Sequence, residues 1–274
     1  MMMMMMNDFI KYVNNYVHIL YNVLLMSTTI TFTATGWNET LSAEDVLDKI
    51  PSYNSMGVAY FSFVVDGYTA IGDNSFSASN LTQEGVYDYA VNTVTLSNSV
   101  ETIGSLAFQG TGLTKITLSE NLHTIGNFAF LGCALTSITI PASVTSIGTG
   151  AFSKIISLTS ITFGIGSLLT SIEYSVFQGN SSLVSITIPP FVGSIAENAF
   201  NESGLTEASI NVDSLGKLGF PTSLGPNQTI GGKAGVNIIG YKIFSGSGEL
   251  TDASNLNGVS QVIIEGYSSI GTDA

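Results

Sequence analysis

The chain contains no arginine, and its 7 cations are all lysines set against 20 acidic residues, for a formal net charge of −13. Nucleic acids and anionic membranes are bound through clustered cations, so this composition argues against both as partners. The acidic residues are scattered rather than grouped in runs, which is typical of a solvated surface. A single cysteine, Cys133, excludes an intramolecular disulfide.

Residues that carry catalysis or bind metals are also scarce. The two histidines, His18 and His123, have no cysteine or carboxylate neighbours at metal-ligand spacing. Cys133 and His123 lack a third, orienting group, so we expect Cys133 to be a half-buried structural residue. The Gly-rich stretch GPNQTIGGKA, from Gly225, has the wrong spacing for a phosphate loop. The sequence therefore predicts no enzyme, no cofactor and no metal site.

The chain is instead dominated by a repeated unit, seen most clearly in LTSITIPASVTSIGTGAF, Leu135 to Phe152. Alternating apolar and β-favouring residues predict a short strand with one buried side, ended by Pro141. Gly148 permits a tight bend, and Phe152 follows in a helical turn that places one aromatic ring inside. One such coil cannot bury its apolar side, so neighbouring coils must stack at about 5 Å per coil.

The spacing of the closing aromatic confirms the period within the sequence. These residues are separated by 22, 22, 25 and 23 positions, and each unit has a matching strand. The aromatics are Phe108, Phe130, Phe152, Phe177 and Phe200, and the strand centres are Val94, Ile116, Ile138, Ile161 and Ile186. The extra residues of the longer units fall around Gly164 to Ser167 and Gly179 to Ser182, where we expect loops.

The unit L-x-x-I-x-I-P-x-x-V-x-x-I-G-x-x-A-F resembles the BspA-type leucine-rich repeat, also known from Treponema pallidum-type surface proteins, over about Gly57 to Ile210. Cys133 stands where this class often has cysteine, but the other copies carry Thr111, Ile155, Asn180 and Ser203 near that point, so no cysteine ladder is expected. The resemblance implies a right-handed repeat solenoid, mainly β, with short helical turns. It also implies display at a cell surface for binding host or partner proteins.

The amino-terminal end has two interpretations. Residues 1–25 are either a leader or a wrongly assigned start, with translation beginning at Met26. As a secretory signal, Val17 to Met26 would be the apolar region, with cleavage before Trp37. This run is too short and too polar for a clear membrane span. A signal would place the protein outside the cell or on its surface, whereas a start at Met26 would make it cytoplasmic.

Internal similarity suggests two modules in tandem. FVVDGYTAIGDNSF, from Phe63, aligns without gaps to VIIEGYSSIGTDA, from Val262. We predict an amino-terminal cap at 26–56, formed by a strand near Thr28 to Thr35 and a short helix beginning at Ser42. The repeat array follows at 57–215, then a Gly/Ser/Asn-rich linker and second cap at 216–257, and a second, truncated array from 258 to 274.

Two surfaces are candidate partner sites. An insertion of about ten residues before Phe108 carries Tyr87 and Tyr89, and tyrosines are good binding anchors, although packing of this loop on the solenoid edge is the simpler interpretation. The strands should also present a face of hydroxyl groups for a protein or glycan partner on a host or neighbouring surface. Its members are Thr95, Lys115, Thr117, Ser137, Thr139, Ser160, Thr162, Ser185 and Thr187.

We therefore expect a non-catalytic binding or adhesion scaffold. Three alternatives remain open at this point: an intracellular interaction scaffold, an ice-binding protein that uses the threonine column, and the remnant of an enzyme whose catalytic domain lies beyond Ala274. For a single threonine, suitability for an exposed strand is a sufficient explanation.

Overall fold

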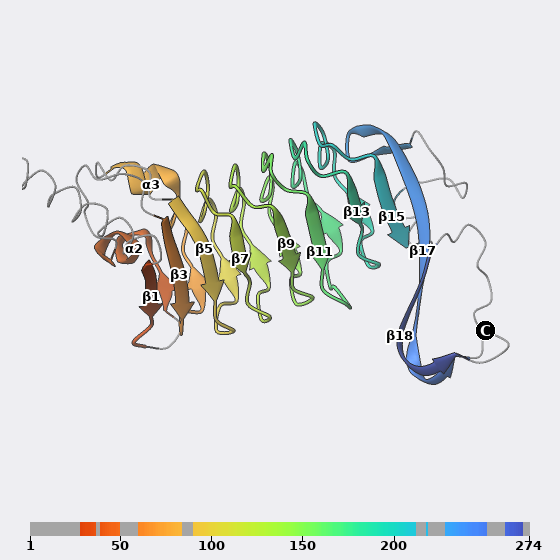
Figure 1. Ribbon diagram of the computed structural model, residues 1–274, viewed down its shortest axis with the longest axis horizontal. Helices are drawn as coiled ribbons and strands as arrows, with labels where there is room; N and C mark the ends of the chain where they lie inside the picture. Colours follow the sequence, from red (N-terminus) through yellow and green to blue (C-terminus); the bar gives the residue numbers. More distant parts are fainter. Residues whose placement is uncertain are drawn as a thin grey trace, which may run out of the picture.

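The computed structural model describes residues 28–36, 39–49, 60–83, 90–211, 218, 228–250 and 261–270. It forms an elongated solenoid in which successive coils stack along the long axis (Figure 1). Each regular coil contributes one strand to a front side and one two-residue strand to a rear side, and a turn with the buried phenylalanine then leads to the next coil. The predicted mainly β repeat architecture is confirmed.

All front strands run parallel, because each coil returns to the same side before the next begins. They are β1 (Thr28–Thr33), β3 (Tyr60–Asp66), β5 (Ala90–Leu96), β7 (Lys115–Thr117), β9 (Ser137–Ile140), β11 (Ser160–Phe163), β13 (Ser185–Thr187), β15 (Glu207–Asn211) and β17 (Lys233–Leu250). The rear strands are β2 (Thr40–Leu41), β4 (Ala70–Ile71), β6 (Thr102–Ile103), β8 (Thr124–Ile125), β10 (Ser146–Ile147), β12 (Ser171–Ile172) and β14 (Ser194–Ile195).

The far end of the solenoid is formed by β17 (Lys233–Leu250). It pairs with β15 on one side and, in parallel, with β18 (Gln261–Ile270) on the other, while β16 (Gln228–Ile230) runs antiparallel to it. In Figure 1 the β17–β18 pair extends beyond the last coil.

The core is a continuous stack of phenylalanine rings. Neighbouring rings from Phe76 to Phe200 lie 5.1–5.9 Å apart with interplanar angles of 3–19°, and all are fully buried. The predicted rise of about 5 Å is thus set by ring-on-ring packing, since an offset stack of aromatics is favourable at this separation. Each ring closes one coil, so the aromatic spacing in the sequence is the coil spacing.

The amino-terminal cap matches the prediction. The helix α2 (Ala43–Lys49) begins after Ser42, whose hydroxyl accepts a bond from the Asp45 N–H at 3.2 Å, while the Asp45 carboxylate accepts from the Ser42 N–H at 2.9 Å. This reciprocal pair is a capping box. Val46 is fully buried and covers the apolar end of the first coil.

The insertion before Phe108 differs from the expected open loop, because it contains a helix, α3 (Ala78–Gln83). Leu81 on this helix is 2% exposed, so the insertion adds to the core rather than simply looping out. Tyr87 and Tyr89 lie outside the described residues.

Close stacking of the rear strands depends on glycine. A Cβ atom on Gly126 would lie 2.6 Å from the backbone carbon of Gly104 and from the nitrogen of Ser105. Gly148 is similarly close to the preceding coil, at 2.7 Å from the Asn127 nitrogen. These contacts are shorter than a Cβ atom tolerates, so glycine is needed at Gly126 and Gly148, whereas Ala196 makes the equivalent bond, to the Ile172 carbonyl at 2.8 Å, with a methyl side chain.

A buried column of polar side chains satisfies the carbonyl groups behind the phenylalanines. The Thr111 hydroxyl and the Cys133 thiol both donate to the Phe108 carbonyl, at 2.8 and 3.0 Å. Two coils on, the Asn180 amide nitrogen donates to the Phe152 carbonyl, and the Asn180 amide oxygen accepts from the Ile155 N–H. Cys133 is 4% exposed, so the expectation of a half-buried cysteine was wrong; the thiol is fully buried because it replaces a hydrogen-bonding side chain inside the stack.

The coil that carries β11 and β12 breaks this regularity. Within residues 90–211 two ladders of this coil are missing, between β11 and β13 on the front side and between β10 and β12 on the rear side. A further front ladder, between β7 and β9, is missing in the preceding coils, whose rear strands remain paired. β11 pairs backwards with β9, whereas β12 pairs forwards with β14, so the coil is tilted between its two neighbours. The tilt opens a gap on the front side between β11 and β13.

Two features of the sequence account for the tilt. Glu173 stands where the three preceding coils have Gly104, Gly126 and Gly148, and each of those glycines donates its N–H to the isoleucine carbonyl one coil back at 2.8 Å. In the described structure the Glu173 N–H makes no such bond to Ile147. The loop after β11 is also longer than its counterpart after β9, as predicted from the sequence.

Candidate binding site

The front strands place two columns of polar side chains on the outer surface. Ser137 aligns with Ser160 and Thr139 with Thr162 across the β9–β11 pair, and Thr95 aligns with Thr117 across β5–β7. All nine residues predicted for this face are exposed. They are Thr95, Lys115, Thr117, Ser137, Thr139, Ser160, Thr162, Ser185 and Thr187. Strand alternation explains this, because the isoleucines between them point into the core.

The columns extend one strand further than the sequence predicts. Glu207 aligns with Ser185, and Ser209 aligns with Thr187, across the β13–β15 pair. The segment EASIN departs from the LTSITI consensus, which hid these two positions. Counting on from Thr206, which holds the same place as Thr159, would have revealed them.

The face is divided into three separately paired parts, by the missing ladders between β7 and β9 and between β11 and β13. The threonine column therefore crosses two breaks in strand pairing. At one of these breaks, between β11 and β13, the front face has a depression.

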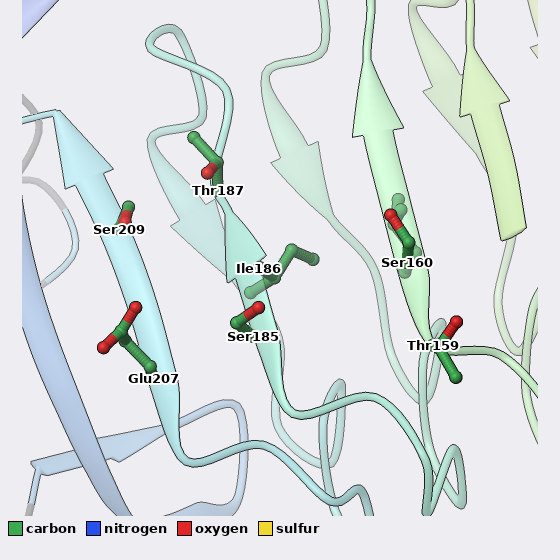
Figure 2. A pocket seen from close by; sticks show the side chains of 8 residues that line it. Thr159, Ser160, Ser185, Ile186, Thr187, Glu207 and Ser209 are labelled. Carbon is green, nitrogen blue, oxygen red and sulfur yellow. The ribbon is translucent and has the colours of Figure 1, made fainter.

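A polar depression of about 220 Å³ lies at the gap between β11 and β13 and reaches β15 (Figure 2). It is lined by Thr159, Ser160, Ile161, Ser185, Ile186, Thr187, Glu207 and Ser209. Hydroxyl groups can both donate and accept hydrogen bonds, and the Glu207 carboxylate adds a strong acceptor. The edges of β11 and β13 that face the gap are unpaired in the ladder, so backbone groups are also available. The arrangement is suited to holding a polar ligand, and it brings together Ser160, Ser185 and Thr187 of the predicted face.

The other candidates do not form a reactive site. Burial raises the pKa of the Cys133 thiol to about 12, so the thiol stays protonated at neutral pH and cannot act as a nucleophile. His123 is exposed, as are Glu101, Thr145 and Thr170 at the equivalent position of other coils. Among the described residues no three His, Cys, Asp or Glu side chains come together in a way that could hold a metal ion.

The described helices are all too short or too polar to cross a membrane.

Comparison with known proteins agrees with this architecture. The model of the BspA type leucine-rich repeat region matches residues 69–206 and 165–265, in 6 copies. No curated protein matches the sequence.

Among solved structures, the pneumococcal vaccine antigen PcpA is similar, at 25% identity and a TM-score of 0.50, over 69% of this chain and 44% of PcpA. The chain thus spans less than half the length of that relative. The Treponema pallidum leucine-rich repeat protein TpLRR is 18% identical over 77% of this chain and 72% of its own, with a TM-score of 0.37. A leucine-rich repeat protein from Bacteroides ovatus is 18% identical over 76% and 68%, with a TM-score of 0.38. Because the family model covers more than half of the sequence, this chain belongs to the BspA type leucine-rich repeat family.

Proposed function

We propose that the protein is a non-catalytic binding scaffold that holds a protein or glycan partner on its front face. The observation that carries this is the polar depression at β11, β13 and β15, since it combines hydroxyl groups, a carboxylate and unpaired strand edges in one concave place. Extended solenoid surfaces are suited to binding because many coils contribute to one continuous face.

The similarity to PcpA, a vaccine antigen of pneumococcus, supports a location outside the cell or on its surface. A partner on a host or neighbouring surface follows from that location. The alternative of an intracellular scaffold would use the same face, because the described geometry of the face is the same in either compartment.

The test uses the full chain and a variant in which Ser160, Ser185 and Thr187, three exposed residues of the depression, are all replaced by lysine. Binding is measured against an array of immobilised glycans and a panel of purified extracellular-matrix proteins. The matched control carries lysine at three exposed rear positions, Thr102, Thr145 and Thr170. We expect the front variant to lose at least one interaction that the rear variant keeps. Equal binding by both variants, or no binding by the unaltered chain, would contradict the proposal.

We also propose that the β17–β18 pair begins a second module. In the first module Phe32 aligns with Val65 across β1–β3, and in the last pair Phe244 aligns with Ile264 across β17–β18. Val65 and Ile264 are equivalent in the internal alignment of the sequence. Phe32 and Phe244 also correspond, because the segments TFTATG, from Thr31, and KIFSGSG, from Lys242, each place a phenylalanine four residues before a glycine. A cap strand followed by a first array strand thus occurs twice in the same register, which supports the division of the chain at 216–257 and 258–274.

A further inference from the structure

The polar depression continues into an apolar groove at the carboxyl-terminal ends of β11 and β13. The groove has a volume of about 420 Å³, and Ile161, Thr162 and Thr187 line it from the strands. Its remaining walls are Phe163, Gly164, Ile165, Gly166, Ser167, Pro189, Pro190, Tyr241 and Ile243. Ile161 and Thr187 also line the depression, so the two spaces meet and form one cleft with a polar half and an apolar half.

Large apolar side chains surround the apolar half at its mouth. Ile165, which lines the groove, is 80% exposed. Leu168 and Phe191, each next in sequence to a lining residue, do not line the groove but are 53% and 63% exposed. Exposed apolar residues that gather around a groove mark interaction sites, because their hydration is unfavourable until a partner covers them.

This cleft is specific to the tilted coil. Gly164 to Leu168 form the longer loop after β11, and the gap itself follows from the missing β11–β13 ladder. Tyr241 fixes the far wall, since its hydroxyl donates to the Ile188 carbonyl at 2.6 Å. The groove is therefore bounded by a rigid contact on one side and by the inserted loop on the other.

We propose that this cleft binds an extended peptide segment of a partner protein, with one bulky apolar side chain in the groove and a lysine or arginine at Glu207. The inference rests on the proposed binding function and names the class of partner. A cationic peptide is favoured by charge, because the protein has a formal net charge of −13 and Glu207 lines the polar half of the cleft. Lys115, the cation of the predicted face, lies away from the cleft on β7. The main chain of the peptide would lie across the outer surface of β11 and β13, where the exposed hydroxyl groups of Ser160 and Ser185 can donate and accept hydrogen bonds.

A peptide fits these features better than a saccharide. Tyr241, one of the two aromatic residues that line the groove, is 1% exposed, so its ring offers little surface on which a sugar could stack. The apolar half, with its phenylalanine, proline and isoleucine walls, instead matches the pockets that receive anchor side chains at protein interfaces.

The probe is a display library of random peptides about twelve residues long, selected on the immobilised full chain. We expect the selected peptides to combine a large apolar residue with a nearby lysine or arginine. Their affinity should fall about tenfold in Ile165→Asp, because a buried interface anchor contributes at this level. The fall in Glu207→Gln should be about threefold, since the carboxylate is partly solvated.

Ile156→Asp is the matched control, because Ile156 belongs to the same coil, is 68% exposed and lies before β11 rather than after it. Both aspartate substitutions are at exposed positions, so folding should be preserved. Unchanged affinity in Ile165→Asp, or equal loss in Ile156→Asp, would overturn the inference.

A third variant separates this inference from the proposed function. Peptides that lose affinity when Thr95, Thr117 and Thr139 become lysine, but keep it in Ile165→Asp, bind elsewhere on the front face; the scaffold function then stands and the cleft assignment falls. Selection that yields no peptide, together with binding on the glycan array, likewise overturns the peptide assignment and leaves the scaffold. Failure of both the peptide library and the panels removes both proposals.

Discussion

The regular coils between Ile103 and Phe152 and the tilted coil between Ser153 and Phe177 are built from the same repeat, yet they differ in what they can do. The regular rear strands bond to each neighbour through glycine, and the rings stack 5.1–5.2 Å apart. At the tilted coil the ring separation widens to 5.9 Å, and ladders are missing on both sides. The concave, chemically mixed surface of the described front face lies at this irregular coil. Regular stacking thus provides stability, and its local failure provides a site.

The largest difference between the two regions should be found in the phenylalanine stack. Phe130→Ala removes a ring packed between two neighbours at 5.2 and 5.1 Å, and we expect a loss of about 3–5 kcal/mol in the free energy of unfolding. Phe177→Ala, with neighbours at 5.9 and 5.5 Å, should cost less, by about 1 kcal/mol. Urea unfolding followed by circular dichroism measures both. Equal losses of unfolding free energy in the two variants would show that the wider ring spacing at Phe177 does not weaken its packing.

Alanine substitutions at Gly126 and at Glu173, the equivalent position of the tilted coil, test whether close contact between coils at this position requires glycine. Gly126→Ala places a Cβ 2.6 Å from the backbone of the preceding coil, so we expect about 2–3 kcal/mol of destabilisation from overpacking. Glu173→Ala, at the equivalent place in the tilted coil, should change stability by less than about 0.5 kcal/mol, because the side chain is exposed. A similar cost at both positions would refute the role assigned to glycine.

The buried Asn180 side chain holds the tilted coil to its regular neighbour. Asn180→Ala leaves the Phe152 carbonyl and the Ile155 N–H without their partner, which should cost about 2 kcal/mol or more. In the regular region Cys133→Ala should cost less, because the Phe108 carbonyl keeps its bond from the Thr111 hydroxyl. Calorimetry measures the loss of stability in both variants. A larger loss in Cys133→Ala than in Asn180→Ala would contradict the view that these side chains stabilise the coils by satisfying buried backbone groups.

Alkaline pH should weaken the regular region through Cys133. The pKa of this thiol is about 12 in the folded protein against 9.0 for the unperturbed group, because burial disfavours the thiolate. A raised pKa means that the associated stability is fully present below about pH 9 and is lost as pH rises towards 12, since the unfolded chain ionises first. We expect about 1 kcal/mol of loss from this group between pH 9 and pH 10. In the Cys133→Ala variant the unfolding free energy should fall less steeply between pH 9 and pH 10. The same pH dependence in both proteins would contradict the role given to the Cys133 thiol.

The smallest expected effect concerns backbone protection. Amides of β11 and β13 that face the gap should exchange with deuterium faster than the ladder-bonded amides shared by β9 and β11, because they have no partner in the ladder. Binding of a selected peptide should slow this exchange. Uniform protection across the three strands in the free protein would show that the gap closes in solution.

Much of the fold was present in the sequence because its periodicity is strict. The Ala-Phe positions predicted the ring stack, the strand centres predicted the front strands, and Ser42 with Asp45 predicted the capped helix. The exposed hydroxyl columns followed from strand alternation alone. Each of these depends on contacts within one coil or between adjacent copies of one coil, so a local pattern is enough.

Other features depend on how unequal coils fit together, and no local pattern contains them. Leu106 and Phe128 adopt left-handed backbone conformations, with φ of 58° and 55°, because every coil must turn at that corner whatever residue stands there. The helix α3 and the full burial of Cys133 were likewise visible only in the assembled solenoid. The sequence by itself determined the repeat, its spacing and the side of each strand that faces water. Only the tertiary structure decided where the stacking fails and a cleft opens, since a gap arises from the mismatch between two coils and is a property of neither one alone.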